Sequence, residues 1–228
     1  MTNLLLLHGA LGSAALFDPL VPHLEKHYTL HCLNFAGHGG EPIPESGYSM
    51  PHFADNVVAY LEQQGIEQIN IFGYSMGGYV GLWLAHRHPQ RVGKLFTLAT
   101  KFDWNPESAA QESRMLNPDK IAEKVPKFAA ALEARHSPQD WRQVLLHTKN
   151  MMTDLGNEPL LTQEVLKSIA HPCLITVGDQ DQMVSHEETL QAAKALPDGE
   201  FACMADTPHP IEKVDPTRLS KWIHEYVG

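Results

Sequence analysis

The sequence predicts an α/β protein with a parallel sheet of about six strands and helices on both faces of the sheet. Three observations predict this class. Short, mainly apolar runs, such as Leu4–Leu7 and Ile69–Phe72, are typical of strands buried on both faces. Segments with apolar residues at helical spacing alternate with these runs, and polar or glycine-containing loops follow the strands. In a parallel sheet such loops gather at the carboxyl ends of the strands, where reactive groups collect.

The composition is that of an ordinary folded protein. The chain has 228 residues, of which 43% are hydrophobic and 19% charged, and we expect one domain over residues 1–228. A formal net charge of −10 without any Lys/Arg run argues against nucleic acid or an anionic membrane as partner. His8-Gly9 ends the apolar N-terminal run early, so we predict neither a signal peptide nor a membrane span and expect a cytoplasmic protein.

Nothing in the sequence indicates a metal or cofactor site. The fourteen histidines are scattered, and Cys32, Cys173 and Cys203 share no metal-ligand spacing. All three cysteines lie in apolar runs, so we expect buried free thiols. We therefore expect no metal, no cofactor and a small-molecule substrate as partner, and the sequence leaves the oligomeric state open.

The first half of the chain alternates predicted strands and helices. Ser49 is a suitable N-cap for the second helix, and Gly65 ends it. Pro89 ends the third helix. We predict strands over Leu4–Leu7, Thr29–Phe35, Ile69–Phe72 and Val92–Ala99, and helices over about 14–26, 50–64 and 77–88.

The second half begins with a helical insertion over about residues 102–170, which is long for a simple crossover between parallel strands. Its clearest helix is predicted to start at Ser137-Pro138 and to end at Gly156, and a second helix covers about 119–135 with an interruption at Pro126. The chain then returns to the sheet. We predict strands over Cys173–Val177 and Phe201–Ala205, a capping box formed by Ser185 with Glu188, and a final helix capped by Asp215-Pro216.

Ser75 lies where the strand Ile69–Phe72 changes abruptly into a helix. Gly73 and Gly77 flank it by two residues on either side, and the lack of a Cβ there permits a strained turn with positive φ at the serine. The hydroxyl is then exposed at a helix N-terminus, where free N–H groups favour negative charge on a substrate oxygen. We predict that Ser75 is a nucleophile.

A serine nucleophile needs a base and a carboxylate that orients the base. His209 is the only histidine that directly follows the last predicted strand, and Asp181 follows the strand before it. Asp179 is a rival acid, but it lies closer to the strand end. Asp103 is a second rival, because it follows the strand that precedes the insertion.

Five segments in this order resemble the α/β-hydrolase-fold serine hydrolases. They are His8–Ser13, Asn34–Gly39, Gly73-Tyr74-Ser75-Met76-Gly77, Gly178–Val184, and His209 with Glu212 and Asp215-Pro216. The resemblance implies a triad of Ser75, Asp181 and His209, an oxyanion hole formed by the backbone N–H groups of Ala10 and Met76, and an insertion that serves as a cap.

The chain departs from this family in two respects. The first strand begins almost at Met1, so the sheet is expected to be trimmed to six parallel strands. Asn34 replaces an aspartate that is common at the start of the Gly-His-Gly loop. An amide makes hydrogen bonds but holds no charge, so we expect this loop and its His38 to be structural.

The predicted chemistry is cleavage of a small ester or thioester through an acyl-enzyme. The cap and neighbouring loops supply a predicted pocket of Leu11, Phe102, Trp141, Met151, Met152 and Met183, which suggests an apolar acyl group. The stripe of Trp141 and Met151 is equally consistent with packing between cap and body. Two alternatives stay open: a cofactor-free lyase or carbon–carbon bond hydrolase of the same fold, and a ligand receptor with little turnover.

Overall fold

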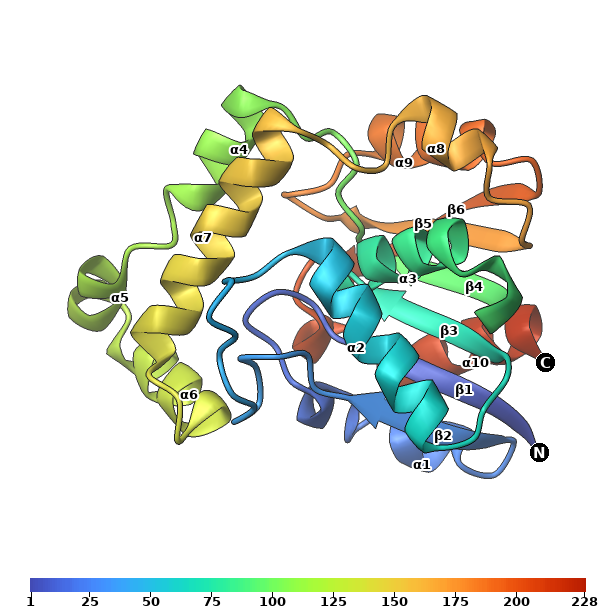
Figure 1. The fold of residues 1–228 in the computed structure, drawn as a ribbon, viewed down its shortest axis with the longest axis horizontal. Helices are drawn as coiled ribbons and strands as arrows, with labels where there is room; N and C mark the ends of the chain where they lie inside the picture. Colours follow the sequence, from blue (N-terminus) through green and yellow to red (C-terminus); the bar gives the residue numbers. More distant parts are fainter.

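The computed structural model describes residues 1–228 and contains one six-stranded parallel sheet of order β2-β1-β3-β4-β5-β6 (Figure 1). This confirms the predicted trimmed parallel sheet. The strands are β1 (Thr2–Leu7), β2 (Tyr28–Leu33), β3 (Ile69–Tyr74), β4 (Val92–Leu98), β5 (Cys173–Gln180) and β6 (Gly199–Pro208). The helices around them are α1 (Val21–Leu24), α2 (Met50–Gln63), α3 (Met76–Arg87), α9 (His186–Ala195) and α10 (Pro216–Val227). None of the helices is both long and apolar enough to cross a membrane.

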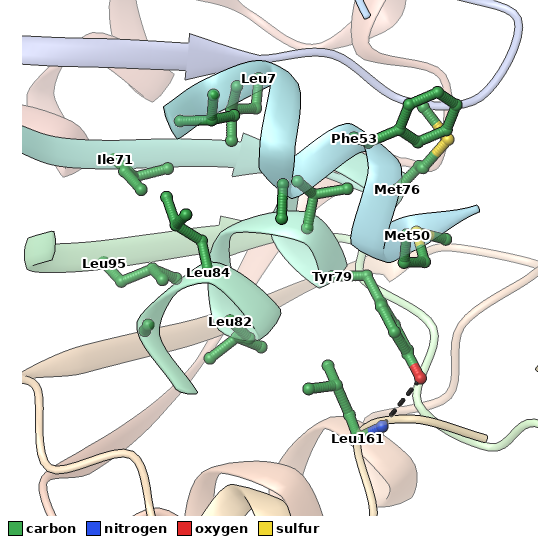
Figure 2. Close-up of a cluster of buried hydrophobic side chains, with 14 of the residues drawn as sticks. Leu7, Met50, Phe53, Ile71, Met76, Tyr79, Leu82, Leu84, Leu95 and Leu161 are labelled. Carbon is green, nitrogen blue, oxygen red and sulfur yellow. Dashed lines mark hydrogen bonds between the residues drawn. The ribbon is translucent and has the colours of Figure 1, made fainter. Parts of the chain in front are cut away.

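Alternate residues of each central strand enter two separate cores, one on each face of the sheet. In β1, Leu5 and Leu7 pack with α2 and α3, whereas Leu4 and Leu6 pack on the opposite face with α10. Figure 2 shows the first core around α3. All four leucines are fully buried, and each burial stabilises the fold by roughly 1.5–3 kcal/mol relative to an exposed side chain. This explains the unbroken apolar run in the sequence.

The predicted single helix over 14–26 is wrong. The chain forms a 3₁₀ turn over Ala14–Phe17 and then the short α1. Pro19 lies between the two turns, and Pro22 lies in the first turn of α1. Neither proline has the N–H group that a continuous helix would need at that position. Phe17, Leu20 and Leu24 of the segment are buried, so the helical spacing predicts which side chains pack inward but not the continuity of the helix.

The segment between β4 and β5 is helical, as predicted. It contains α4 (Pro106–Ser113), α5 (Pro118–Lys124), α6 (Pro126–His136), α7 (Trp141–Asn157) and α8 (Gln163–Lys167). Helices α4 to α7 lie to one side of the sheet (Figure 1), and the predicted break at Pro126 is confirmed. The predicted start of the long helix at Ser137-Pro138 is wrong, because Asp140 caps α7 by accepting a hydrogen bond from the N–H of Arg142.

Helix α7 joins the insertion to the body. Val144, Met151 and Leu155 belong to the core that also contains α2 and α3. The returning chain is held by Tyr79 of α3, whose hydroxyl oxygen accepts hydrogen bonds from the N–H groups of Leu160 (3.0 Å) and Leu161 (2.9 Å). Figure 2 shows the second of these bonds. The insertion is therefore packed tightly against the helix that begins after Ser75.

The expectation of three buried thiols is only partly correct. Cys173 is buried in the central strand β5, but Cys32 is partly exposed and Cys203 is exposed. Both exceptions lie on the two edge strands, β2 and β6. An edge strand lacks a neighbour on one side, so an apolar sequence run there does not guarantee burial.

Candidate active site

The turn at Ser75 has the strained geometry that the two glycines predict. Ser75 has φ 52° and ψ −115°, directly between β3 and α3. A Cβ on Gly77 would lie 2.1 Å from the carbonyl oxygen of Leu7, and a Cβ on Gly73 would lie 2.5 Å from Cα of Gly78. Only glycine at these two positions lets β1, β3 and α3 approach closely enough to form the turn.

The loops after β5 and β6 bring Asp181 and His209 into contact. Oδ2 of Asp181 accepts a hydrogen bond from Nδ1 of His209 at 2.8 Å, and the carboxylate is fully buried. Its other oxygen, Oδ1, accepts from the N–H groups of Met183 (2.8 Å) and Val184 (2.9 Å). With the proton on Nδ1, the outer nitrogen of His209 is free to accept a proton.

Several groups act on the Asp181 carboxyl. Burial raises its pKa, but the hydrogen bond and charge of His209, together with the N–H groups of Val184 and Met183, outweigh burial and keep the pKa below the usual value. Asp181 therefore stays ionised and orients the ring. The backbone of His209 is fixed as well, because the Tyr74 hydroxyl donates to its carbonyl oxygen at 3.0 Å.

Ser75 and His209 line one cavity of about 40 Å³, although the Ser75 hydroxyl makes no hydrogen bond in this structure. Hydrogen bonds between a catalytic serine and its base are often long or absent when no substrate is bound. Ala10 and Met76 border the same cavity, and the hydrogen bonds of the turns and caps use neither of their N–H groups. Both residues therefore border the cavity and have backbone N–H groups that these turns and caps leave unused.

The three methionines of the predicted pocket, Met151, Met152 and Met183, line this cavity, and the other three predicted residues do not. Trp141 packs inside the insertion with Ile121, Leu132 and Leu145. Phe102 borders a separate open groove beside α8 and α9. Leu11 packs against two hydrophobic clusters instead.

Sequence reasoning missed six lining residues: Met50, Tyr79, Lys101, Trp104, Glu112 and Val184. Tyr79 could have been found, because it lies one helical turn after Ser75 and so shares its face of α3. The others lie at the ends of elements whose relative placement depends on tertiary packing.

Neither rival acid touches His209. Oδ1 of Asp103 accepts a hydrogen bond from Nδ2 of Asn105 at 3.1 Å, next to the start of α4. Asp179 accepts from the N–H of Thr207 at 3.1 Å. The Asp103 carboxylate thus bonds a side-chain amide and the Asp179 carboxylate a backbone N–H, which leaves Asp181 as the only one of the three paired with the histidine.

The loop after β2 is held by its own polar groups. Oδ1 of Asn34 accepts from the N–H of Ala14 at 2.7 Å, and Nδ1 of the buried His38 lies 3.1 Å from the carbonyl oxygen of Ala36. Neither residue lines the cavity with Ser75. The geometry agrees with a structural role for this loop.

Three buried histidines, His8, His38 and His136, connect the insertion to the body next to Ala10. The ring centroids of His8 and His38 are 5.2 Å apart, and those of His38 and His136 are 5.7 Å apart. Nδ1 of His136 accepts from the N–H of Gly39 (3.1 Å), so its Nε2 donates to the carbonyl oxygen of Leu11 (3.2 Å). Burial lowers the pKa of His8 and of His136 to about 4, and that of His38 well below its usual value.

Because these three histidines are buried and neutral, we expect the protein to lose stability in acid. The folded state keeps the three imidazoles neutral, whereas in the unfolded chain they take up protons near pH 6.5. Their contribution to the free energy of unfolding is therefore present above about pH 6.5 and is lost as the pH falls toward 4. For His8 and for His136, the shift is expected to lower the free energy of unfolding at pH 5 by on the order of 1–2 kcal/mol. Urea unfolding at pH 7 and pH 5 measures this, and His136→Gln should reduce the difference between the two. An unchanged free energy of unfolding across this range would contradict the prediction.

Similarity to known proteins identifies the family of this chain. Residues 2–132 match the alpha/beta hydrolase fold model, and the chain belongs to that family. It is 32% identical over 154 residues to the pimeloyl-[acyl-carrier protein] methyl ester esterase of Aeromonas hydrophila, a match covering 62% of this chain and 59% of that esterase. It is 21% identical over 242 residues to the 2-(acetamidomethylene)succinate hydrolase of Mesorhizobium japonicum, covering 98% of this chain and 87% of the relative.

Solved structures share the same fold. A thermophilic esterase from Thermogutta terrifontis superimposes with a TM-score of 0.81 at 21% sequence identity, over 100% of this chain and 89% of that one. At this level of identity the likeness extends to the fold, and the chemistry has to be argued from the side chains of this chain.

Proposed function

We propose that this protein is a cofactor-free serine hydrolase that cleaves a small ester or thioester through an acyl-enzyme. The single observation that carries the proposal is the 2.8 Å contact between His209 and the buried Asp181 at the cavity that also holds the strained Ser75. Binding alone requires no oriented base next to a serine. The Aeromonas relative, which is named as an esterase, supports the same class of reaction.

The proposed reaction has two steps. The outer nitrogen of His209 takes the proton from Ser75 Oγ as the oxygen attacks the carbonyl carbon, and the N–H groups of Ala10 and Met76 donate to the oxyanion. His209 then gives the proton to the leaving alcohol or thiol, and the acyl group stays on the serine. Water attacks this ester with His209 again as base, which releases the acid and restores Ser75. The methionines of the cavity favour an apolar acyl group.

A fluorophosphonate probe and a panel of p-nitrophenyl esters with acyl chains of different length test the proposal. We expect the probe to label Ser75, as found by peptide mass analysis, and we expect turnover of short acyl esters, because the cavity is only about 40 Å³. Labelling without turnover of any ester would point to a lyase or a receptor. If Ser75 is not labelled, it is not an activated nucleophile and the proposal is wrong.

A further inference from the structure

The cavity beside Ser75 carries charged groups as well as methionines. Lys101, which closely follows β4, and Glu112, on α4, both line it. Glu188, on α9, lies behind them. The side chains of these residues are only 14%, 13% and 11% exposed. Charges so far removed from water need partners, so their remaining hydrogen-bonding capacity indicates what kind of group the cavity accepts.

The charge of Lys101 is shared between two carboxylates of the protein. Its ammonium group donates one hydrogen bond, to the carbonyl oxygen of Met183 at 3.2 Å, and forms longer ion pairs with Oε1 of Glu112 at 3.6 Å and Oε2 of Glu188 at 4.0 Å. The group also lies 6.0 Å from the centre of the Trp104 ring. One cation is thus shared between two carboxylates.

The carboxylates of Glu188 and Glu112 differ in how many hydrogen bonds they already accept. Oε1 of Glu188 accepts from the N–H of Phe102 at 3.2 Å, and its Oε2 accepts from the Ser185 hydroxyl at 3.2 Å. Glu188 therefore reaches toward the insertion, and the predicted reciprocal capping box does not form, since only Ser185 caps the backbone of α9. Glu112 accepts no hydrogen bond at all, and Lys101 is its only ion-pair partner. Its oxygens keep free acceptor capacity within the cavity.

We propose that Glu112 makes this cavity selective for acyl groups whose chain ends in a hydrogen-bond donor, such as an ammonium, amide N–H or hydroxyl group, and that it excludes acyl chains ending in a free carboxylate. The inference rests on the proposed hydrolase function and names its substrate class. Lys101, Glu112 and Glu188 carry a formal net charge of −1. A ligand carboxylate would add a third anion around one cation, whereas a donor would satisfy the unused oxygens of Glu112.

Three methyl esters of similar size test this selectivity, because their acyl chains end in a methyl, an ammonium or a carboxylate group: methyl butyrate, methyl 3-aminopropanoate and monomethyl succinate. Methanol release at pH 7 gives kcat/KM for each. We expect the ammonium ester to be cleaved at least as fast as the butyrate, and the succinate at least about 10-fold more slowly. A preference for the succinate would make Lys101 a carboxylate receptor and would overturn the proposal.

Glu112→Gln removes the charge and keeps the shape. It should lower the ratio of kcat/KM for the ammonium ester to that for the butyrate by about 10-fold, and should raise the succinate-to-butyrate ratio by a similar factor. Glu107→Gln is the matched control, because Glu107 lies on the same helix but is exposed and outside the cavity. If the two kcat/KM ratios are the same in the wild type, Glu112→Gln and Glu107→Gln, the role of Glu112 is refuted.

A binding measurement separates this inference from the proposed function. Calorimetric titration of Ser75→Ala with the same three esters reports their affinity without turnover. If the wild type cleaves none of the esters but Ser75→Ala still binds the ammonium ester more tightly than the succinate, the hydrolase proposal fails and the selectivity of the cavity stands. If the three esters bind equally, the selectivity is wrong whatever the wild type cleaves.

Discussion

Replacing Ser75 by alanine is expected to lower kcat by at least about three orders of magnitude, because the substitution removes the atom that forms the acyl-enzyme. The free energy of unfolding should stay close to that of the wild type. The Ser75 side chain donates no hydrogen bond, and alanine must adopt the same positive φ as serine. Steady-state kinetics on a short p-nitrophenyl ester and urea unfolding together separate lost chemistry from lost folding.

Ser46→Ala is a suitable control for this experiment, since Ser46 is exposed in a loop outside the cavity. It should leave both kcat and the unfolding midpoint unchanged. Retention of more than about a tenth of the wild-type kcat/KM in Ser75→Ala would contradict the proposed mechanism, because an oxyanion hole without a nucleophile provides far less acceleration than an intact triad.

The sequence was sufficient for the sheet because its signals are local. The central strands are mainly apolar and bury residues on both faces of the sheet, so the sequence pattern and the burial agree. The turn at Ser75 was equally readable, since Gly73 and Gly77 are required by close backbone contacts with neighbours in the same strand–turn–helix unit or in β1. Where two prolines interrupted an amphipathic segment, at Pro19 and Pro22, periodicity alone overestimated the helix.

The insertion and the cavity were harder to predict because their contacts join distant segments. On α7, Trp141 and Met151 share one apolar stripe in the sequence, yet Trp141 is buried among the helices of the insertion and Met151 reaches the cavity. A stripe shows that a helix is packed, but it does not show against what. The contact of Lys101 with Glu112 and Glu188 likewise joins three separate elements, and no spacing in the sequence records it.

Asp181→Asn is expected to lower kcat by about 10⁴-fold, the effect of the corresponding change in serine proteases, with KM little changed. The structure gives the reason. The N–H groups of Met183 and Val184 both point at Oδ1, so the asparagine must place its carbonyl oxygen there and its NH₂ group toward His209. The ring must then accept at Nδ1 and carry its proton on the outer nitrogen, where it can no longer take the proton of Ser75.

Asp103→Asn is the matched variant, since Asp103 was the rival acid in the sequence and its carboxylate meets Asn105 instead of His209. We expect less than about a 2-fold change in kcat for this variant, because an exposed carboxylate outside the cavity contributes little. The two variants remove one negative charge each, so a general effect of charge would alter both equally. If Asp103→Asn abolishes turnover while Asp181→Asn retains it, the acid that orients His209 comes from the start of the insertion, and the assignment of Asp181 has to be withdrawn.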